Sequence, residues 1–308
     1  MPRNAAVSGP APAGGTAIRS EVPEIEVHPF QGAIRKTDRA TVHMAELKRL
    51  TTGFLDEEEP PPFRAVEGIE RDPSRYVMRA AIDRPFPEWW SLIVGDFVQN
   101  LRAALDHFVC QLIYDAGGEP TRQNAFPIFH ERPSDRRSKN RWKAQISGLD
   151  DDAIEFIERC QPYHHDEDPR NHTFFALREL SNEDKHRLVL PVVCAIATPS
   201  EDFEIEVLES RDVAPISKGK LHSRYALKDG DLIAEAPVEI TGPEPDVRAT
   251  AHFTLELGFG GDPIVPTQGL WQMFKSVRAT LHRAAHDLRG YSTPVMESEL
   301  AGWLTVDS

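Results

Sequence analysis

Hydrophobic residues recur at helical spacing in three long stretches of the chain, and residues that end helices close each stretch. An acidic run and three prolines close the first, Gly117-Gly118 the second and Gly290 the third. The second also has Pro87 in a position suited to a first helical turn. The pattern therefore predicts long helices over residues 32–55, 87–115 and 267–289.

The remaining stretches predict shorter elements. Residues 63–70 and 76–83, separated by a turn sequence, predict a β-hairpin ahead of the second long helix. Residues 150–160 and 169–182 predict two short helices, whereas residues 126–142 have little periodicity and predict a basic loop. From 188 to 260, apolar and polar residues alternate around a Lys228-Asp229-Gly230-Asp231 turn, which favours antiparallel strands.

These elements predict an α+β protein with a helical body, an N-terminal β-hairpin and an antiparallel β insert before the last helix. We expect a disordered tail over residues 1–30 and a mainly helical domain over 31–187. The β insert then covers 188–262, and the helix of the C-terminal segment, 263–308, packs on the helical body.

Composition narrows the class of protein. The 308 residues include 35 Lys and Arg against 49 Asp and Glu, and the formal charge is -14. This charge disfavours coating of a nucleic-acid backbone or an anionic membrane, but it allows a local basic patch. Such a patch is predicted around the loop 126–142, where six cations lie between positions 132 and 143: Arg132, Arg136, Arg137, Lys139, Arg141 and Lys143.

Cysteine usage and hydropathy indicate the compartment. Cys110, Cys160 and Cys194 are widely spaced and form no C-x-x-C pair, so neither a disulfide framework nor a thiolate zinc site is predicted. No run of about 18 apolar residues occurs. We expect a soluble, cytoplasmic protein without a membrane partner.

The second long helix contains the octet Asn100-Leu101-Arg102-Ala103-Ala104-Leu105-Asp106-His107. A guanidinium, a carboxylate and an imidazole on one rigid element can bind phosphate, move a proton or ligate a metal. At about 100° per residue, the leucines point into the core, Asn100, Asp106 and His107 fall on the polar side, and Arg102 lies near the boundary.

Arg102 and His107 form an R-x4-H pattern that resembles the signature of the HEPN superfamily of small helical nucleases, toxins and nucleotide-handling domains. The resemblance covers one helix and implies metal-independent RNA cleavage near a dimer interface, in which the ribose 2′-hydroxyl attacks the adjacent phosphate. His107 would then move a proton and Arg102 would stabilise charge on the phosphate. Family members often have a polar residue where this chain has Ala103.

A second polar cluster, Asp184-Lys185-His186-Arg187, lies at the predicted junction between a helix and the first strand of the insert. Junction residues are often functional, so we expect these four to bind ligand together with Asn100. The octet followed by D-K-H-R also resembles a group of uncharacterised bacterial proteins over most of the chain, a group with no established activity. As an alternative, Lys185 and His186 stabilise the helix dipole and Arg187 faces solvent.

A structural alternative also exists for the octet. Arg102 and Asp106 stand four residues apart and can form an intrahelical ion pair, while neighbouring helices satisfy Asn100 and His107. The same side chains would then hold helices together and catalyse nothing.

Three functional hypotheses follow. The first is a HEPN-like, metal-independent RNA-cleaving or RNA-binding protein without a cofactor, with Arg102, Asp106 and His107 as catalytic residues and a homodimer completing the site. The second is a non-catalytic protein that binds a small anionic ligand or a partner. The third is a metal-dependent hydrolase that uses histidines and carboxylates from several helices. His282 and His286 are a candidate pair of ligands, although the cations on the same helix oppose binding of a metal ion.

Overall fold

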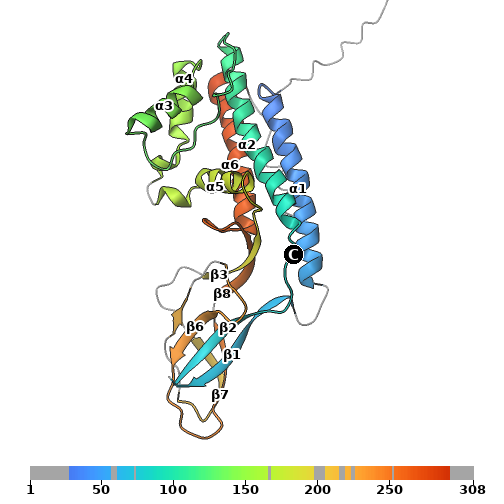
Figure 1. The fold of residues 1–308 in the computed structure, drawn as a ribbon, viewed down its shortest axis with the longest axis vertical. Helices are drawn as coiled ribbons and strands as arrows, with labels where there is room; N and C mark the ends of the chain where they lie inside the picture. Colours follow the sequence, from blue (N-terminus) through green and yellow to red (C-terminus); the bar gives the residue numbers. More distant parts are fainter. Residues whose placement is uncertain are drawn as a thin grey trace, which may run out of the picture.

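The chain folds into a helical body and a β lobe arranged along one long axis (Figure 1). The computed structural model describes residues 28–56, 61–72, 74–165, 168–197, 205–214, 219–222, 226–251 and 253–291. Residues 1–27 of the predicted tail lie outside this part. The α+β class with antiparallel sheets and an N-terminal hairpin is confirmed.

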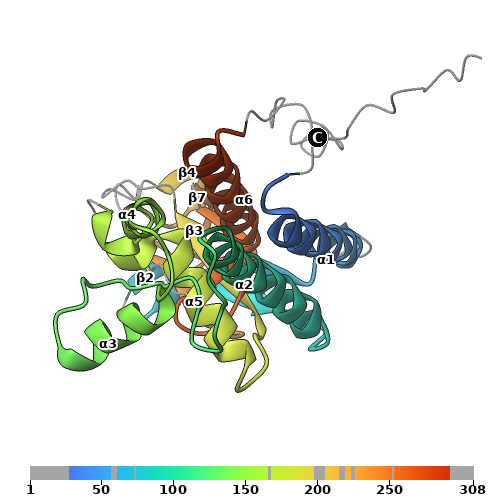
Figure 2. The ribbon, with the colours of Figure 1, turned by 90° about the horizontal axis from the view of Figure 1, so that it is seen from above.

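The helical body is built around α2, which contacts α1, α5 and α6 (Figure 2). The helices are α1 (Gln31–Asp56), α2 (Trp90–Asp115), α3 (Arg136–Gln145), α4 (Asp151–Arg159), α5 (Thr173–Asp184) and α6 (Thr267–Arg289). Short 3-10 turns at Pro162–His164 and Pro169–Asn171 join α4 to α5. The three long helices correspond to the three predicted ones.

The apolar face of α2 explains its central position. Both leucines of the octet, Leu101 and Leu105, are fully buried, as are Phe97 and Phe108 on the same face. Burying a side chain of this size contributes roughly 1.5–3 kcal/mol, so this face fixes the rotation of α2 about its axis. The rotation then decides where the polar residues of the octet point.

The helix ends follow local signals. Gly117 (φ +79°) follows α2, and Gly290 (φ +60°) ends α6, where the N–H groups of Gly290 and Tyr291 bond carbonyl oxygens of the last turn. The N–H of Trp90 bonds the Pro87 carbonyl in a turn, so α2 begins at Trp90 and not at Pro87.

The prediction of a basic loop over residues 126–142 is wrong in its second half. Asp135 caps a helix there, because its carboxylate accepts the backbone N–H groups of Arg137 and Ser138, and α3 follows. The charged residues of α3 hide this helix from a search for apolar periodicity.

The β lobe combines three antiparallel sheets. Its strands are β1 (Phe63–Arg71), β2 (Ser74–Ile82), β3 (Pro191–Ala197), β4 (Ile205–Arg211), β5 (Lys220–Leu221), β6 (Leu232–Pro237), β7 (Asp246–Ala251), β8 (Phe253–Phe259) and β9 (Val265–Pro266). They are ordered β1-β2-β6-β5, β3-β8-β9 and β4-β7. The Lys228–Asp231 turn forms as predicted, with Gly230 at φ +81°.

The N-terminal hairpin belongs to the β lobe. The sequence places it within the mainly helical segment 31–187, but β2 pairs with β6, with Tyr76 opposite Ala236 and Met78 opposite Ala234. Phe86, in the link from β2 to α2, packs against both hydrophobic cores. The β lobe is therefore assembled from segments before and after most of the helices.

In the described part of the chain, no helix is both long enough and apolar enough to cross a membrane.

Candidate anion-binding site

Arg102 and Asp106 form the intrahelical ion pair that their spacing predicts, and both also hold the backbone of Phe126. The Arg102 guanidinium donates to the Asp106 carboxylate at 2.8 Å and to the Phe126 carbonyl oxygen at 2.6 Å. The same carboxylate oxygen accepts the Phe126 N–H at 2.9 Å. The pair thereby fixes the segment between α2 and α3 against α2.

Burial and charge act in opposite directions on this pair. Burial raises the pKa of the Asp106 carboxyl, while Arg102, the Phe126 N–H and Lys185 act to lower it. Burial lowers the pKa of the Arg102 guanidinium, and the charge of Arg141 lowers it further. Arg102 nevertheless stays protonated at physiological pH, as arginine does in proteins. Arg141 and Lys185 therefore add further positive charge beside a guanidinium that is already charged.

These cations converge on a cavity of about 80 Å³ between α2, α3 and α5. Four of its lining residues are basic: Arg102, Arg141, Arg178 and Lys185. The other lining residues are Phe126, Ile128, Gln145, Ser181 and Asn182, so no carboxylate lines the cavity. Its size suits a single oxyanion group rather than a whole organic ligand.

Two of the four cations are compensated and two are not. Arg102 pairs with Asp106, and Arg178 pairs with Glu179 at 2.6 Å while also donating to the Ile128 carbonyl oxygen. Arg141 and Lys185 are exposed and form no ion pair with any described residue. The cavity therefore carries an excess of positive charge that an anion can neutralise.

Gln145 adds an unsatisfied polar group to the cavity. This residue is 8 % exposed, and its Oε1 atom has no hydrogen-bond partner. A buried amide without partners costs free energy, about 1–3 kcal/mol. The two ends of a glutamine amide exchange by a rotation about χ3, so either the carbonyl oxygen or the NH₂ group can occupy this position.

The α5 wall explains why these residues meet. Arg178, Ser181, Asn182 and Lys185 are spaced at three to four residues and share one face of α5 and its C-cap. The adjacent face carries the buried Leu177 and Leu180, and Ser181, at the border between the two faces, is buried as well. Burial of those leucines against the core turns the polar face toward Arg102.

His107 does not reach this cavity. The side chain is exposed, and a Cβ atom placed on Gly32 would lie 3.3 Å from its Nδ1 atom. Gly32 belongs to α1, which lies on the other side of α2 from α3 (Figure 2). Within one chain the structure therefore separates Arg102 from His107, which the HEPN resemblance would bring together.

The other predicted site residues are also dispersed. Asn100 donates to the Asp96 carbonyl oxygen on its own helix at 2.7 Å. Asp184 packs against α2, where it accepts a hydrogen bond from Gln99 at 2.9 Å, and Arg187 is largely exposed and bridges Glu183 at 3.3 Å. His186 is exposed. Of the cluster at positions 184–187, only Lys185 lines the cavity.

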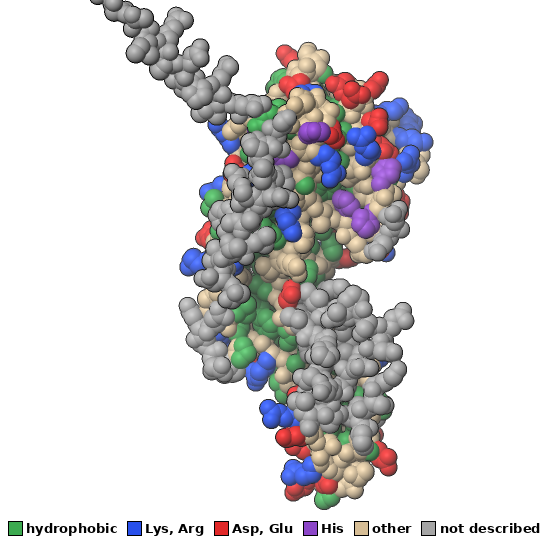
Figure 3. Space-filling model, turned by 180° about the vertical axis from the view of Figure 1, so that it is seen from behind, with side chains coloured by type: hydrophobic (Ala, Val, Ile, Leu, Met, Phe, Trp, Pro, Cys, Tyr) green, Lys and Arg blue, Asp and Glu red, His purple; other side chains and the backbone are tan. Residues whose placement is uncertain are grey.

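Helix α3 extends the basic surface beyond the cavity. Its ten residues contain five exposed cations and no acidic residue, namely Arg136, Arg137, Lys139, Arg141 and Lys143. None of the five forms an ion pair with a residue in the described part of the chain. Figure 3 shows Lys and Arg side chains gathered at the outer edge of the helical body, on the side where α3 and α4 lie.

The placement of Arg136 and Arg137 does not serve helix stability. They occupy the first turn of α3, where the positive end of the helix dipole disfavours cations. Their charge is uncompensated in a protein with a formal charge of -14. Helix stability therefore does not explain this arrangement.

The residues that could hold a metal ion do not gather. Among the described residues, no group of three or more His, Cys, Asp or Glu side chains is placed to bind one. Of the two predicted histidines, His282 is half-buried beside His28, whereas His286 is exposed and contacts Asp287.

Sequence reasoning missed Arg141, Arg178 and Gln145 as site residues. The sequence shows the basic run around Arg141 but gives no apolar periodicity for α3, the helix that carries it. The spacing of Arg178, Asn182 and Lys185 was a usable signal, since it predicts one helical face.

Comparisons with protein-family models, with curated proteins and with solved structures gave no match. The HEPN resemblance therefore stays a prediction from the R-x4-H pattern.

Proposed function

We propose that the protein binds RNA through its phosphodiester backbone, with one phosphate in the cavity of Arg102, Arg141, Arg178 and Lys185. The observation that carries the proposal is the convergence of four cations, two of them uncompensated, on a cavity without a carboxylate. Guanidinium groups match the geometry of phosphate oxygens, and the cavity size suits one such group.

Helix α3 favours a polyanionic strand over a small phosphorylated ligand. A small ligand would use Arg141 at the cavity and leave the other four cations of α3 in solvent. Successive phosphates of a strand would also neutralise the cations at the start of α3. Proteins of net negative charge can still bind RNA in this way, because a local basic surface provides the attraction.

The proposal concerns binding and not cleavage, since His107 lies on the α1 side of α2. Metal-independent cleavage, which the R-x4-H pattern implies, would require His107 of a second copy to approach the cavity. This stays a prediction, and the same experiments test it.

The test is fluorescence anisotropy with a labelled single-stranded RNA of about 12 nucleotides, within the usual site size of such proteins. We expect affinity to fall as salt rises from about 50 to about 200 mM, with a slope that reflects a few phosphate contacts. Arg141→Ala should weaken binding and reduce that slope by about 0.7–1. Arg248→Ala, at an exposed arginine in the β lobe, serves as the matched control and should bind like the original protein.

Two outcomes would contradict the proposal. If Arg141→Ala and Arg137→Gln leave RNA binding unchanged, the RNA does not bind at this cavity. Stabilisation by inorganic phosphate or a nucleoside monophosphate, without RNA binding, would favour the small-ligand alternative.

A further inference from the structure

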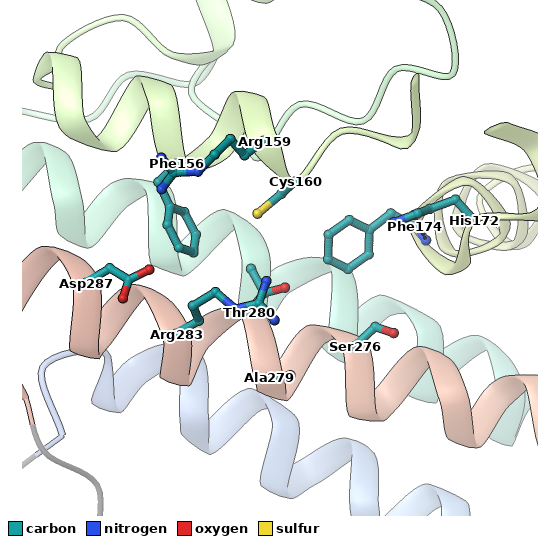
Figure 4. Close-up of a pocket in the computed structure, with 10 residues that line it drawn as sticks. All are labelled: Phe156, Arg159, Cys160, His172, Phe174, Ser276, Ala279, Thr280, Arg283 and Asp287. Carbon is teal, nitrogen blue, oxygen red and sulfur yellow. Dashed lines mark hydrogen bonds between the residues drawn. The ribbon is translucent and has the colours of Figure 1, made fainter. Parts of the chain in front are cut away.

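A second cavity, of about 530 Å³, lies between α4, the start of α5 and α6 (Figure 4). It shares no lining residue with the basic cavity. A volume of this size lies within the range of roughly 300–1,000 Å³ that small-molecule sites occupy. The cavity exists because α6 presents short side chains to it, among them Ser276 and Ala279.

One wall of this cavity is apolar. Phe156 from α4 and Phe174 from α5 point their rings into it, with the Cys160 thiol between them (Figure 4). Burial raises the pKa of the Cys160 thiol to about 11, so the sulfur is uncharged at neutral pH and packs as a small polarisable group. This wall offers contact to an apolar or aromatic body and no nucleophile.

The α6 wall carries the charge. Arg283 is exposed to the cavity and forms no ion pair with a described residue. Arg159, which also lines the cavity, pairs with Glu155 at 2.8 Å, and Asp287 contacts His286 at 2.9 Å. Arg283 therefore faces the cavity from α6 without an ion-pair partner among the described residues, and the carboxylate of Asp287 lines the same cavity one turn further along α6.

Two further groups that can donate a hydrogen bond line the cavity, Thr280 on α6 and His172 beyond Phe174 (Figure 4). Thr280 stands about one turn before Arg283 on the same helix. His172 caps α5, with its Nδ1 accepting the Phe174 N–H at 3.1 Å, and this bond leaves the Nε2–H of the neutral ring as a donor.

We propose that this cavity binds a small organic monocarboxylate, whose carboxylate pairs with Arg283 and whose apolar body lies against Phe156, Cys160 and Phe174. A single uncompensated guanidinium matches one negative charge, and its planar fork matches a carboxylate. A phosphate dianion is better matched by the cavity at Arg102, where two cations are uncompensated. The site is independent of the proposed RNA site.

The probe is 2-naphthoate, and 2-naphthamide is its uncharged control. In calorimetry with the full chain, we expect naphthoate to bind in the range of about 1 mM or tighter and naphthamide at least about tenfold more weakly.

Variants locate the binding. Arg283→Ala should weaken naphthoate binding about tenfold or more, and Arg283→Lys should retain part of the affinity, because lysine keeps the charge without the fork. Arg248→Ala should change nothing. Ala279→Leu fills the cavity and should abolish naphthoate binding. If this larger side chain disturbs the fold, the variants at the exposed Arg283 still test the proposal.

Several outcomes would overturn the proposal: no binding of naphthoate at about 1 mM, equal binding of naphthamide, or an affinity that Arg283→Ala leaves unchanged. Displacement of naphthoate by inorganic phosphate would reassign the cavity to simple anions. Binding that depends on Arg141 and not on Arg283 would place the ligand in the other cavity.

Discussion

Arg102 and Asp106 hydrogen-bond opposite ends of the same residue, one at the carbonyl oxygen of Phe126 and the other at its N–H. The ion pair between them is thus a clamp on the backbone as well as a contact within α2. The clamped segment leads to α3, whose Arg141 lines the basic cavity together with Arg102. A substitution at either residue is therefore expected to disturb both the local fold and the basic cavity.

We expect Asp106→Ala to lower the free energy of unfolding by about 2–3 kcal/mol, because it leaves the Phe126 N–H unpaired and the Arg102 charge without its partner. Urea unfolding followed by circular dichroism measures this change. Asp96→Ala, at an exposed carboxylate of the same helix, is the control and should change stability by less than about 0.5 kcal/mol. A loss no larger than that of the control would contradict the clamp.

The ion pair between Arg102 and Asp106 was predictable from the sequence, but its contact with the backbone of Phe126 was not. Spacing of four residues on a helix brings Arg102 and Asp106 together whatever the rest of the chain does. Phe126 reaches them through packing of its buried ring against Phe108 and Phe174, and no local pattern encodes that contact. Long-range contacts of this kind are set by the whole core.

The same distinction applies to the fold and to the candidate site. Apolar periodicity located α1, α2 and α6, because burial dominates long helices. It missed α3, whose stability depends on the Asp135 cap and whose side chains are mostly charged. It also could not reveal that the burial of Leu101 and Leu105 leaves Arg102 and His107 facing different neighbours.

Gly95 allows α5 to approach α2 closely. A Cβ atom at this position would lie 2.1 Å from the Asp184 Oδ1 atom, so alanine must displace Asp184 from its hydrogen bond with Gln99. In an open helix, glycine to alanine gains about 1 kcal/mol. Here we expect Gly95→Ala to lower the free energy of unfolding by about 1 kcal/mol instead.

A double-mutant cycle tests this explanation. In an Asp184→Ala background the steric conflict is gone, and we expect Gly95→Ala to become neutral or stabilising. Thermal and urea unfolding of the four proteins provide the interaction energy. Additive effects would show that Asp184 is not the obstacle.

His28 should make stability fall in mild acid. Burial, with the charges of His282 and Arg278, lowers the pKa of His28 to about 4 from its usual 6.5. The unfolded chain therefore takes up a proton as the pH falls through 6.5, whereas the folded chain resists until about 4. The contribution of the neutral His28 ring to the free energy of unfolding is therefore fully present above pH 6.5, and it is lost progressively as the pH falls from 6.5 to about 4.

Because His28 is only half-buried, solvent screening reduces the contribution of its pKa shift to stability. We expect His28 to account for about 1 kcal/mol of the decrease in the free energy of unfolding between about pH 7.5 and about pH 5. His28→Gln should show a correspondingly smaller loss in urea unfolding at the two pH values. His286→Gln, at an exposed histidine of α6, is the control. An equal loss in His28→Gln and in the original protein would contradict the assignment.

His107→Ala separates the binding proposal from the activity that the R-x4-H pattern implies. Because the imidazole lies beside Gly32 on the α1 side of α2, we expect this variant to bind RNA with unchanged affinity and salt dependence. Arg141→Ala should weaken binding under the same conditions, and His186→Ala provides a control at another exposed histidine. Anisotropy of labelled RNA in metal-free buffer measures the affinity, and a denaturing gel of the same samples measures cleavage.

Cleavage that His107→Ala abolishes while binding persists would establish a catalytic His107 supplied across an interface. Loss of binding in a folded His107→Ala protein would instead show that RNA occupies the α1 side of α2 and that the basic cavity has been misassigned.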